Sequence, residues 1–382
     1  MSRRNVIVVG AGPVGSVAAL ACARLGLGVT LLEAEEKVDS SPRASTTQPP
    51  TLEILAALGL IEEYIRVGIV SRTFQFWERA TRRLVAEFDF ERLRGETEFP
   101  YVVQTEQHKL ANMAIARLRA SPNAEVRFGE RASDIRQDAD GVEIVCGDKT
   151  YAADYVIACD GGRSTLRKRL GIEFEGYTWP ERFLVITTAF DFQAALGCSL
   201  RNYMADPDEW TNLFKVAGDD LKGRWRAVFN TREDEADEEA LSDAAVRARL
   251  GRIYVPESSR DYLHLNLYNV HQRVAKQFRR GRVFLCGDAA HVNNPIGGLG
   301  LNCGIHEAWD LVGLLQRVFR GEPEAILAEY EARRRPLNIK YVQEQTVANK
   351  KRLEEREPAA REKRFDELRR TQDDPRAHKA FL

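Results

Sequence analysis

The stretch NVIVVGAGPVGSVAALACARLGLGVTLLE, from Asn5 to Glu33, determines the fold class. Its first five residues form a continuous apolar run, which is typical of a parallel strand buried on both faces. Glycines follow, then an alanine-rich segment with helical character and a second apolar run that ends at Glu33. A strand, a helix and a strand within about 30 residues predict a βαβ unit, and so an α/β fold with a Rossmann-like sheet.

The glycines after the first strand form the pattern G-x-G-x-x-G at Gly10, Gly12 and Gly15. In this context Gly10 makes the tight turn, Gly12 lets backbone approach a pyrophosphate, and Gly15 lets the helix pack closely on the strand. The helix N-terminus favours the bound anion. Glu33 is expected to accept hydrogen bonds from an adenosine ribose and to repel a 2′-phosphate. The pattern therefore predicts FAD or NAD rather than NADP.

A second glycine-rich loop, GDAAHVNNPIGGLGLN, follows another buried apolar run at residues 287–302. Asp288 could accept a hydrogen bond from a ribityl hydroxyl, and Gly297, Gly298 and Gly300 let backbone N–H groups approach a flat ring. A helix expected from about Leu301 directs its positive end to the same place. Because the chain has only one G-x-G-x-x-G, a single long ligand held by both loops is the better explanation. FAD fits this description better than NAD.

Between the two loops the pattern changes to alternating apolar runs over about residues 183–268, which predict an antiparallel sheet interrupted by an acidic helix. One helix is expected over residues 51–68, and a β meander over residues 126–159. A chain that leaves one sheet and later returns to it predicts interleaved domains. We expect an FAD-binding domain at 1–75, 100–175 and 275–340, a substrate domain at 76–99 and 176–274, and a charged helical C-terminal segment at 341–382. The charges favour a solvated surface helix with a frayed end.

Composition excludes several classes of function. Lys plus Arg (56) nearly equals Asp plus Glu (57), so bulk charge does not favour a nucleic-acid partner. No apolar run reaches the roughly 18 residues of a membrane span, and the N-terminus lacks a secretory pattern. The six cysteines have no ligand-like spacing, and several lie in apolar runs. They predict buried reduced thiols, no metal site and a cytoplasmic protein.

Four motifs in this order resemble those of the single-component FAD-dependent aromatic hydroxylases (class A flavoprotein monooxygenases), of which 4-hydroxybenzoate hydroxylase is the familiar member. They are GAGPVG with Glu33, CDGGRSTLRKRLG at 159–171, the late glycine loop, and AEYEARRRP at 328–336. The resemblance implies further FAD contacts, with Asp160 also serving the pyridine nucleotide. The implied contacts are Arg43, Gln104, Asp160, Asp288, Gly298, Gly300, Leu301 and Asn302.

The resemblance also implies an activity. NAD(P)H would bind transiently and reduce FAD, O₂ would form a flavin C4a-hydroperoxide, and one oxygen atom would pass to an activated aromatic ring. A phenol, a hydroxybenzoate or a hydroxypyridine would serve as substrate. Since the cofactor carries the hard chemistry, the protein must orient the ring and exclude water. Pro295 is expected to form part of the reaction chamber wall, and a homodimer is possible because similar proteins are often dimers.

Substrate-binding side chains are expected from the antiparallel sheet. Arg224 and Arg226 alternate with Trp225 and so share one face, which is either the pocket or solvent. Tyr203 could contact the ring or relay a proton, and Arg201 is a further candidate. His291 and His306 are expected to be structural.

Two alternatives remain open from the sequence. One is a non-catalytic FAD- or NAD-binding redox regulator. The other is a different flavin reaction on the same fold, such as that of an epoxidase or a prenyl-lipid reductase. Only an enzyme needs the glycine loop after Pro295 together with an enclosed pocket in the second domain.

Overall fold

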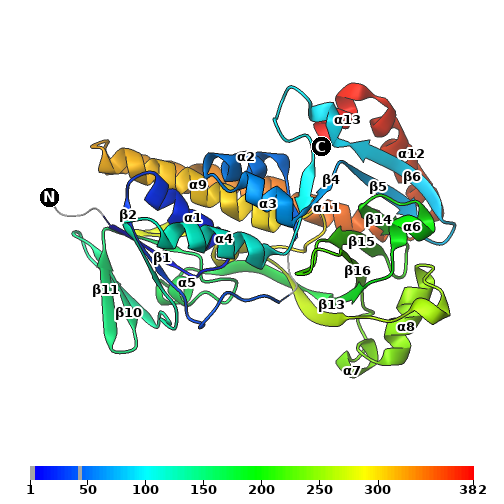
Figure 1. Cartoon of the computed structure of the whole chain (residues 1–382), viewed down its shortest axis with the longest axis horizontal. Coiled ribbons are helices and arrows are strands. Elements are labelled where there is room, and N and C mark those ends of the chain that lie inside the picture. Colours follow the sequence, from blue (N-terminus) through cyan, green and yellow to red (C-terminus); the bar gives the residue numbers. More distant parts are fainter. Residues whose placement is uncertain (1–4, 42–44) are drawn as a thin grey trace.

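The computed structural model describes residues 5–41 and 45–382, and its two main sheets lie beside each other along the long axis (Figure 1). The first is a six-stranded, mostly parallel sheet with β18 antiparallel at its edge. Its strands, in spatial order, are β18 (Arg279–Arg280), β19 (Val283–Leu285), β12 (Tyr155–Ala158), β1 (Asn5–Val9), β2 (Gly28–Leu32) and β8 (Ala124–Arg127).

The βαβ unit predicted from the first 33 residues is confirmed. β1 pairs in parallel with both β2 and β12, and Val6, Ile7 and Val8 are fully buried. Helix α1 (Pro13–Arg24) connects β1 to β2. It packs against α4 (Gln107–Arg119) and α9 (Leu299–Phe319), and the three helices cover one side of the sheet (Figure 1).

The helix expected over residues 51–68 is instead two helices, α2 (Pro49–Ala57) and α3 (Ile61–Val67). The prediction of one helix was wrong because Gly59 adopts a φ of +71°, which breaks the helical geometry between them.

The second sheet has eight strands and contains the antiparallel strands expected from the alternating apolar runs. Its order is β20 (His291–Val292), β17 (His264–Ala275), β13 (Phe174–Thr188), β16 (Arg224–Asn230), β15 (Thr211–Val216), β14 (Arg201–Ala205), β5 (Thr73–Glu78) and β6 (Arg83–Asp89). Only β14 and β5 pair in parallel. The interleaved α/β architecture is confirmed, since strands of the two sheets alternate along the chain.

Two small sheets complete the strand pattern. The meander over residues 126–159 contains β9 (Asp134–Gln137), β10 (Val142–Cys146) and β11 (Lys149–Ala153) as one antiparallel sheet. The other sheet joins β3 (Thr46–Thr47), β7 (Val102–Gln104) and β4 (Ile69–Ser71). Short helices α5 (Thr165–Arg169) and α6 (Phe192–Leu196) lie in connecting segments.

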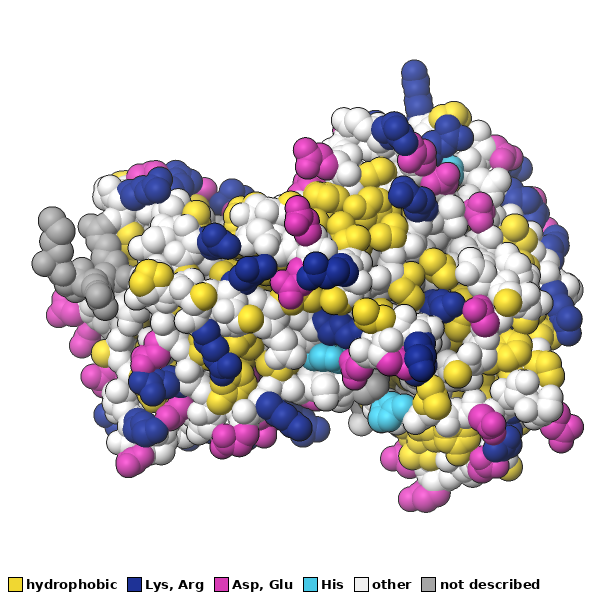
Figure 2. Space-filling view, in the orientation of Figure 1, with side chains coloured by type: hydrophobic (Ala, Val, Ile, Leu, Met, Phe, Trp, Pro, Cys, Tyr) yellow, Lys and Arg dark blue, Asp and Glu magenta, His cyan; other side chains and the backbone are white. Residues whose placement is uncertain are grey.

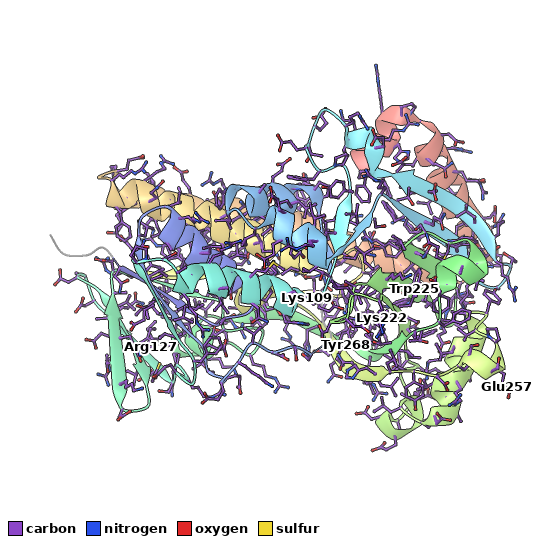
Figure 3. All side chains as sticks on the ribbon, viewed as in Figure 1. Lys109, Arg127, Lys222, Trp225, Glu257 and Tyr268 are labelled. Atoms are coloured by element: carbon purple, nitrogen blue, oxygen red, sulfur yellow. The ribbon has the colours of Figure 1, made fainter. Side chains whose placement is uncertain are left out.

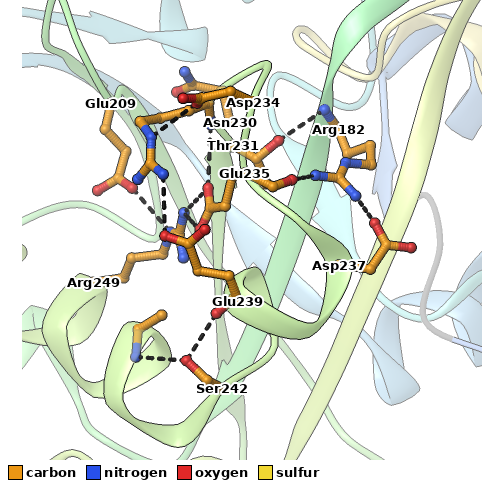
Figure 4. Close-up of polar contacts among 12 residues, drawn as sticks. Arg182, Glu209, Asn230, Thr231, Asp234, Glu235, Asp237, Glu239, Ser242 and Arg249 are labelled. Carbon is orange, nitrogen blue, oxygen red and sulfur yellow. Dashed lines mark hydrogen bonds and ion pairs between the residues drawn. The ribbon is translucent and has the colours of Figure 1, made fainter.

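The acidic segment forms α7 (Asp237–Ala240) and α8 (Asp243–Arg252), which a buried ionic network joins to the large sheet (Figure 4). Arg249 of α8 donates to both carboxylate oxygens of Glu235 at 2.8 and 2.7 Å, and to Glu209 at 2.9 Å. The side chains of Arg249 and Glu235 are 3% and 2% exposed, so solvent screens this pair weakly.

We expect Arg249→Met to lower the free energy of unfolding by about 3–5 kcal/mol, because it leaves the Glu235 carboxylate buried without its cation. Urea denaturation measures the effect. Arg247→Met on the same helix is the matched control. Arg247 is 41% exposed and pairs with Asp243 at i, i+4, so its loss should cost less than about 1 kcal/mol. If the two variants lower the free energy of unfolding by equal amounts, burial of the pair does not determine its contribution to stability.

The C-terminal segment is helical as expected, but the expectation of a solvated, frayed helix was wrong. After α10 (Ala328–Leu337) and a π-helical segment come α11 (Glu344–Leu353), α12 (Pro358–Asp373) and α13 (Pro375–Phe381). Phe365 and Leu368 are buried, and the ring of Phe381 lies 4.4 Å from that of Phe88 on β6. The last helices therefore cover the apolar face of β5 and β6 (Figure 1).

On the face in Figure 2, acidic and basic side chains are interspersed, in line with the near-zero net charge. Within residues 5–41 and 45–382, no helix is both long enough and apolar enough to cross a membrane.

Candidate active site

A cavity of about 840 Å³ lies between the parallel sheet and the large sheet. Its size falls in the range of about 300–1,000 Å³ that is common for ligand sites. The loop after β1 and the late glycine loop both line it, although they are nearly 300 residues apart in the chain. Tyr268 of β17 also lines it, and lies where the two parts of the molecule meet (Figure 3).

The first glycine loop has the geometry expected of a pyrophosphate site. Gly10 adopts a φ of +102°, and a β-carbon there would lie 2.3 Å from the carbonyl oxygen of Cys159. A β-carbon on Gly15 would lie 1.9 Å from the carbonyl oxygen of Gly10. By contrast, apart from its immediate chain neighbours, no atom of the described residues lies within 4 Å of the β-carbon position of Gly12. Two glycines are therefore needed for packing, while the third leaves bare backbone beside the cavity, which fits a dinucleotide.

Two carboxylates lie beside this loop. Glu33 lines the cavity and accepts a 2.6 Å hydrogen bond from the backbone N–H of Ala11, which ties the end of β2 to the loop. Asp160 also lines the cavity, and it accepts hydrogen bonds from the hydroxyl of Ser164 at 2.6 Å and the N–H of Leu166 at 3.0 Å. Burial raises the pKa of Asp160, although these hydrogen bonds oppose the shift.

The late loop brings Asp288, Pro295, Gly298, Gly300 and Leu301 to the same cavity. Gly298 adopts a φ of +67° and immediately precedes α9, which begins at Leu299 rather than at about Leu301. The first residues of α9 thus lie at the cavity wall, where their backbone N–H groups have no partner within the helix and favour negative charge.

Two residues implied as cofactor contacts, Gln104 and Asn302, are not among the described residues that line the cavity. Gln104 is fully buried opposite Thr46, which does line the cavity, and its amide donates to the carbonyl oxygens of Leu200 and Lys215 at 3.0 and 2.8 Å. Asn302 also does not line the cavity. Its side-chain amide donates a 2.9 Å hydrogen bond to the carbonyl oxygen of Thr46. Arg43 lies outside the described residues. The side chains of Gln104 and Asn302 therefore form hydrogen bonds that connect separate segments of the chain.

Arg224 and Arg226 leave β16 on the same side, yet only Arg226 lines the cavity. Arg226 is 4% exposed, and burial lowers its pKa while the Glu106 carboxylate opposes that shift. Arg224 lies at the start of the strand and pairs with Asp220 at 2.6 Å. Trp225 points to the opposite side, into the core of the large-sheet part. Arg226 thus faces the cavity, whereas Arg224 is paired with Asp220 at the start of the strand.

Arg201 and Tyr203, which alternate on β14, both line the cavity and contact each other. Arg201 also donates a 3.1 Å hydrogen bond to the carbonyl oxygen of Gly297. The ring of Tyr203 stacks on Phe76 at 5.1 Å. This pair therefore connects the large sheet directly to the late glycine loop.

Acidic side chains and the arginines of the large sheet line different parts of the cavity. Among the described residues that line it, every carboxylate comes from outside the large sheet, whereas the large sheet contributes two arginines with asparagines and tyrosines. Burial raises the pKa of Tyr268, and nearby Arg226 opposes the shift. Asn266 and Tyr268 also line the cavity, and the sequence did not lead us to name them. Their spacing of two on a predicted strand places them on one face, and that pattern could have identified them.

The two histidines have the structural partners expected of them. His291 is fully buried and hydrogen-bonds Glu307 at 2.8 Å, while His306 contacts the hydroxyl of Thr51 at 3.0 Å. All six cysteines are free thiols. Among the described residues, His291, Cys303 and Glu307 come close enough together to be considered as metal ligands, a proximity that their sequence spacing did not indicate.

Comparison with known proteins agrees with this arrangement. Residues 3–345 match the model of a family described as FAD binding domain. The chain is 35% identical to para-nitrophenol 4-monooxygenase of Pseudomonas sp. (strain WBC-3), covering 94% of this chain and 89% of that protein. It is 33% identical to 6-hydroxy-3-succinoylpyridine 3-monooxygenase HspB of Pseudomonas putida (strain DSM 28022 / S16), covering 93% and 90%. The crystal structure of p-nitrophenol 4-monooxygenase PnpA from Pseudomonas putida DLL-E4 superposes with a TM-score of 0.91 at 32% identity, covering 99% of this chain and 96% of that one.

Proposed function

This chain belongs to the FAD-binding-domain family of single-component aromatic monooxygenases, and from that premise we propose that it hydroxylates a single-ring phenol that is anionic at neutral pH. A phenolate with an electron-withdrawing group and a phenol with a carboxylate both belong to this class. The two relatives named above act on a nitrophenol and a hydroxypyridine, as their names state.

The observation that carries this proposal is the pair of arginines on the substrate side of the cavity. Arg201 and Arg226 are the two arginines that the large sheet contributes to the described lining of the cavity. Guanidinium groups stay protonated at any physiological pH and bind anionic oxygens through charge-assisted hydrogen bonds. Two such groups on one side of the cavity favour an anionic substrate over a neutral one.

We further propose how the cofactor lies. The loop Gly10–Gly15 and Glu33 would hold its ADP half, with Asp160 beside the pyrophosphate. Asp288, Pro295 and the residues Gly298–Leu301 would hold its flavin half. When bound, FAD supplies the transfer of one oxygen atom from O₂ to the ring, with electrons from NAD(P)H.

The protein's own part is to bind, orient and enclose the substrate. Arg226 would pair with the anionic group of the substrate, and Tyr203 would contact its ring or hydroxyl. Pro295 would help to exclude water from the space between the ring and the flavin. The first N–H groups of α9 would stabilise negative charge that develops on the reduced cofactor.

The test is a substrate panel with purified holoenzyme. We expect 4-nitrophenol, 4-hydroxybenzoate or a hydroxypyridine to accelerate NADH or NADPH oxidation, with about one hydroxylated product per reduced nucleotide. For a phenol that is anionic as its phenolate, the O-methyl ether is the matched control, since it keeps the ring and lacks the charge. It should give little product and mainly peroxide. Equal product from the ether and the phenol would contradict the proposed role of charge.

Of the alternatives open from the sequence, the redox regulator is disfavoured by the named monooxygenase relatives and by the cavity that both glycine loops line. No feature of the described cavity specifically favours an epoxidase or a prenyl-lipid reductase. A purified protein that binds FAD and oxidises NAD(P)H with none of the phenols would reopen that question.

A further inference from the structure

Glu307 of α9 is fully buried and does not line the cavity, yet its carboxylate joins α9 to the loop at residues 287–292. The backbone N–H of Gly287 donates to Oε2 at 2.9 Å. Nε2 of His291 lies 2.8 Å from Oε1, and the thiol of Cys303 donates to the same oxygen at 3.4 Å. We call Glu307, Gly287, His291 and Cys303 the Glu307 cluster. Gly287 immediately precedes Asp288, which does line the cavity.

Packing around the cluster leaves the Gly287 turn little room to move. A β-carbon on Gly304 of α9 would lie 2.9 Å from the α-carbon of Gly287 and 2.7 Å from a methyl group of Val14. Gly287 adopts a φ of +59°, and a β-carbon there would also meet Val14, at 3.1 Å. Helix α9, the Gly287 turn and the first turn of α1 are therefore in direct contact. The two glycine loops that line the cavity therefore come together at this contact.

The chemistry of the cluster suggests more than a contribution to stability. Burial opposes the charged form of His291, but the Glu307 carboxylate together with Cys303 holds the pKa of His291 well above its usual value. Nδ1 of His291 has no hydrogen-bond partner among the described residues. Buried pairs of ionisable side chains often stabilise a fold no better than apolar side chains would. The carboxylate, however, offers one oxygen to the N–H of Gly287 and the other to His291 and Cys303, and an amide, with a single oxygen, cannot replace both.

We propose that Glu307 is a positioning residue for the cofactor, which fixes the Gly287–Asp288 turn relative to the start of α9. This inference rests on the proposed placement of FAD across the two loops. Without the carboxylate, the Gly287–Asp288 turn and the first turn of α9 could move independently. Asp288 and the residues Gly298–Leu301 would then no longer contact the same ligand.

The test compares Glu307→Gln with Glu235→Gln in the full-length holoenzyme. Glu235 is a matched control because it is also a buried carboxylate in an ion pair, with Arg249, but belongs to the network of Figure 4 and does not line the cavity. FAD release on dilution is followed by the rise in flavin fluorescence. We expect Glu307→Gln to raise the dissociation constant of FAD about 10- to 100-fold and to shift the visible spectrum of the bound flavin. Glu235→Gln should lower thermal stability and change neither quantity.

Glu307→Asp should recover part of the FAD affinity, because it restores a carboxylate with two acceptor oxygens at shorter reach. If Glu307→Gln does not fold, His291→Gln provides the second test. It removes one member of the pair while leaving the Gly287 contact, and should raise the dissociation constant by a smaller factor. The proposal is overturned if the cluster variants lose stability as Glu235→Gln does but keep wild-type FAD affinity and spectrum. It is also overturned if the wild type holds one transition-metal ion per chain that Glu307→Gln lacks, since the cluster would then be a metal site. Neither result depends on which phenol is hydroxylated.

Discussion

Replacing Arg226 with methionine is expected to raise the KM for an anionic phenol by about 10- to 100-fold while FAD affinity stays unchanged. Methionine keeps much of the buried volume and removes the charge. Hydrogen bonds to charged groups contribute about 1.5–3 kcal/mol, which is the origin of this range. Steady-state NAD(P)H oxidation with increasing phenol concentration measures KM, and product analysis measures how much of the oxidation is coupled to hydroxylation.

Arg224→Met is the control for this prediction, because Arg224 leaves the same strand on the same side but pairs with Asp220 instead of lining the cavity. Its KM should stay within about twofold of the wild type, in line with the small effect of a partly exposed pair. If the two variants raise KM equally, the charge at position 226 does not contact the substrate. If only FAD affinity falls, Arg226 belongs to the cofactor site.

Gly12→Val is expected to weaken FAD binding by more than about 100-fold without unfolding the protein. The backbone of Gly12 has a φ of −64°, which any residue can adopt, and its β-carbon would meet no atom within 4 Å in the described part of the chain beyond its own neighbours. The valine side chain would instead occupy the space proposed for the pyrophosphate. Flavin content after purification and thermal unfolding of the apoprotein measure the two effects.

Gly313→Val is the corresponding control, since Gly313 lies in α9 and its β-carbon would also meet nothing within 4 Å. That variant should keep its FAD. A Gly12→Val protein that retains FAD at wild-type affinity would mean that the pyrophosphate lies elsewhere. Gly15→Ala is unsuitable as a binding test, because its β-carbon would clash with the backbone of Gly10 and disturb the fold itself.

Local pattern was sufficient to predict the first βαβ unit and the nucleotide loop, but it assigned β8 to the meander although β8 pairs in parallel with β2. The apolar run of β1, the glycine spacing and Glu33 are all contiguous, and the packing of Gly10 and Gly15 follows from their lack of a side chain. Alternation on β16 also placed Arg226 and Trp225 on opposite faces. It could not separate Arg226 from Arg224, because their different surroundings depend on the turn that carries Asp220.

Long-range packing explains what the sequence did not reveal. The charges of α12 indicated a solvated helix, while Phe365 and Leu368 provide a narrow apolar stripe that is too short to predict burial. The motif around Gln104 predicts proximity to the cofactor, which stays a prediction, while it gave no sign that the amide binds the backbone of the large sheet. The Glu307 cluster joins residues up to 20 positions apart through tertiary contacts, and the spacing of these residues in the sequence does not indicate that they meet.

The central claim, that one FAD molecule spans both glycine loops, is tested most directly by a crystal structure of the full chain bound to FAD. We expect the ADP half to contact Gly12 and Glu33, and the isoalloxazine ring to lie beside Pro295 and the start of α9. A structure in which the two loops hold separate molecules, or in which the ring lies away from the late loop, would contradict the account.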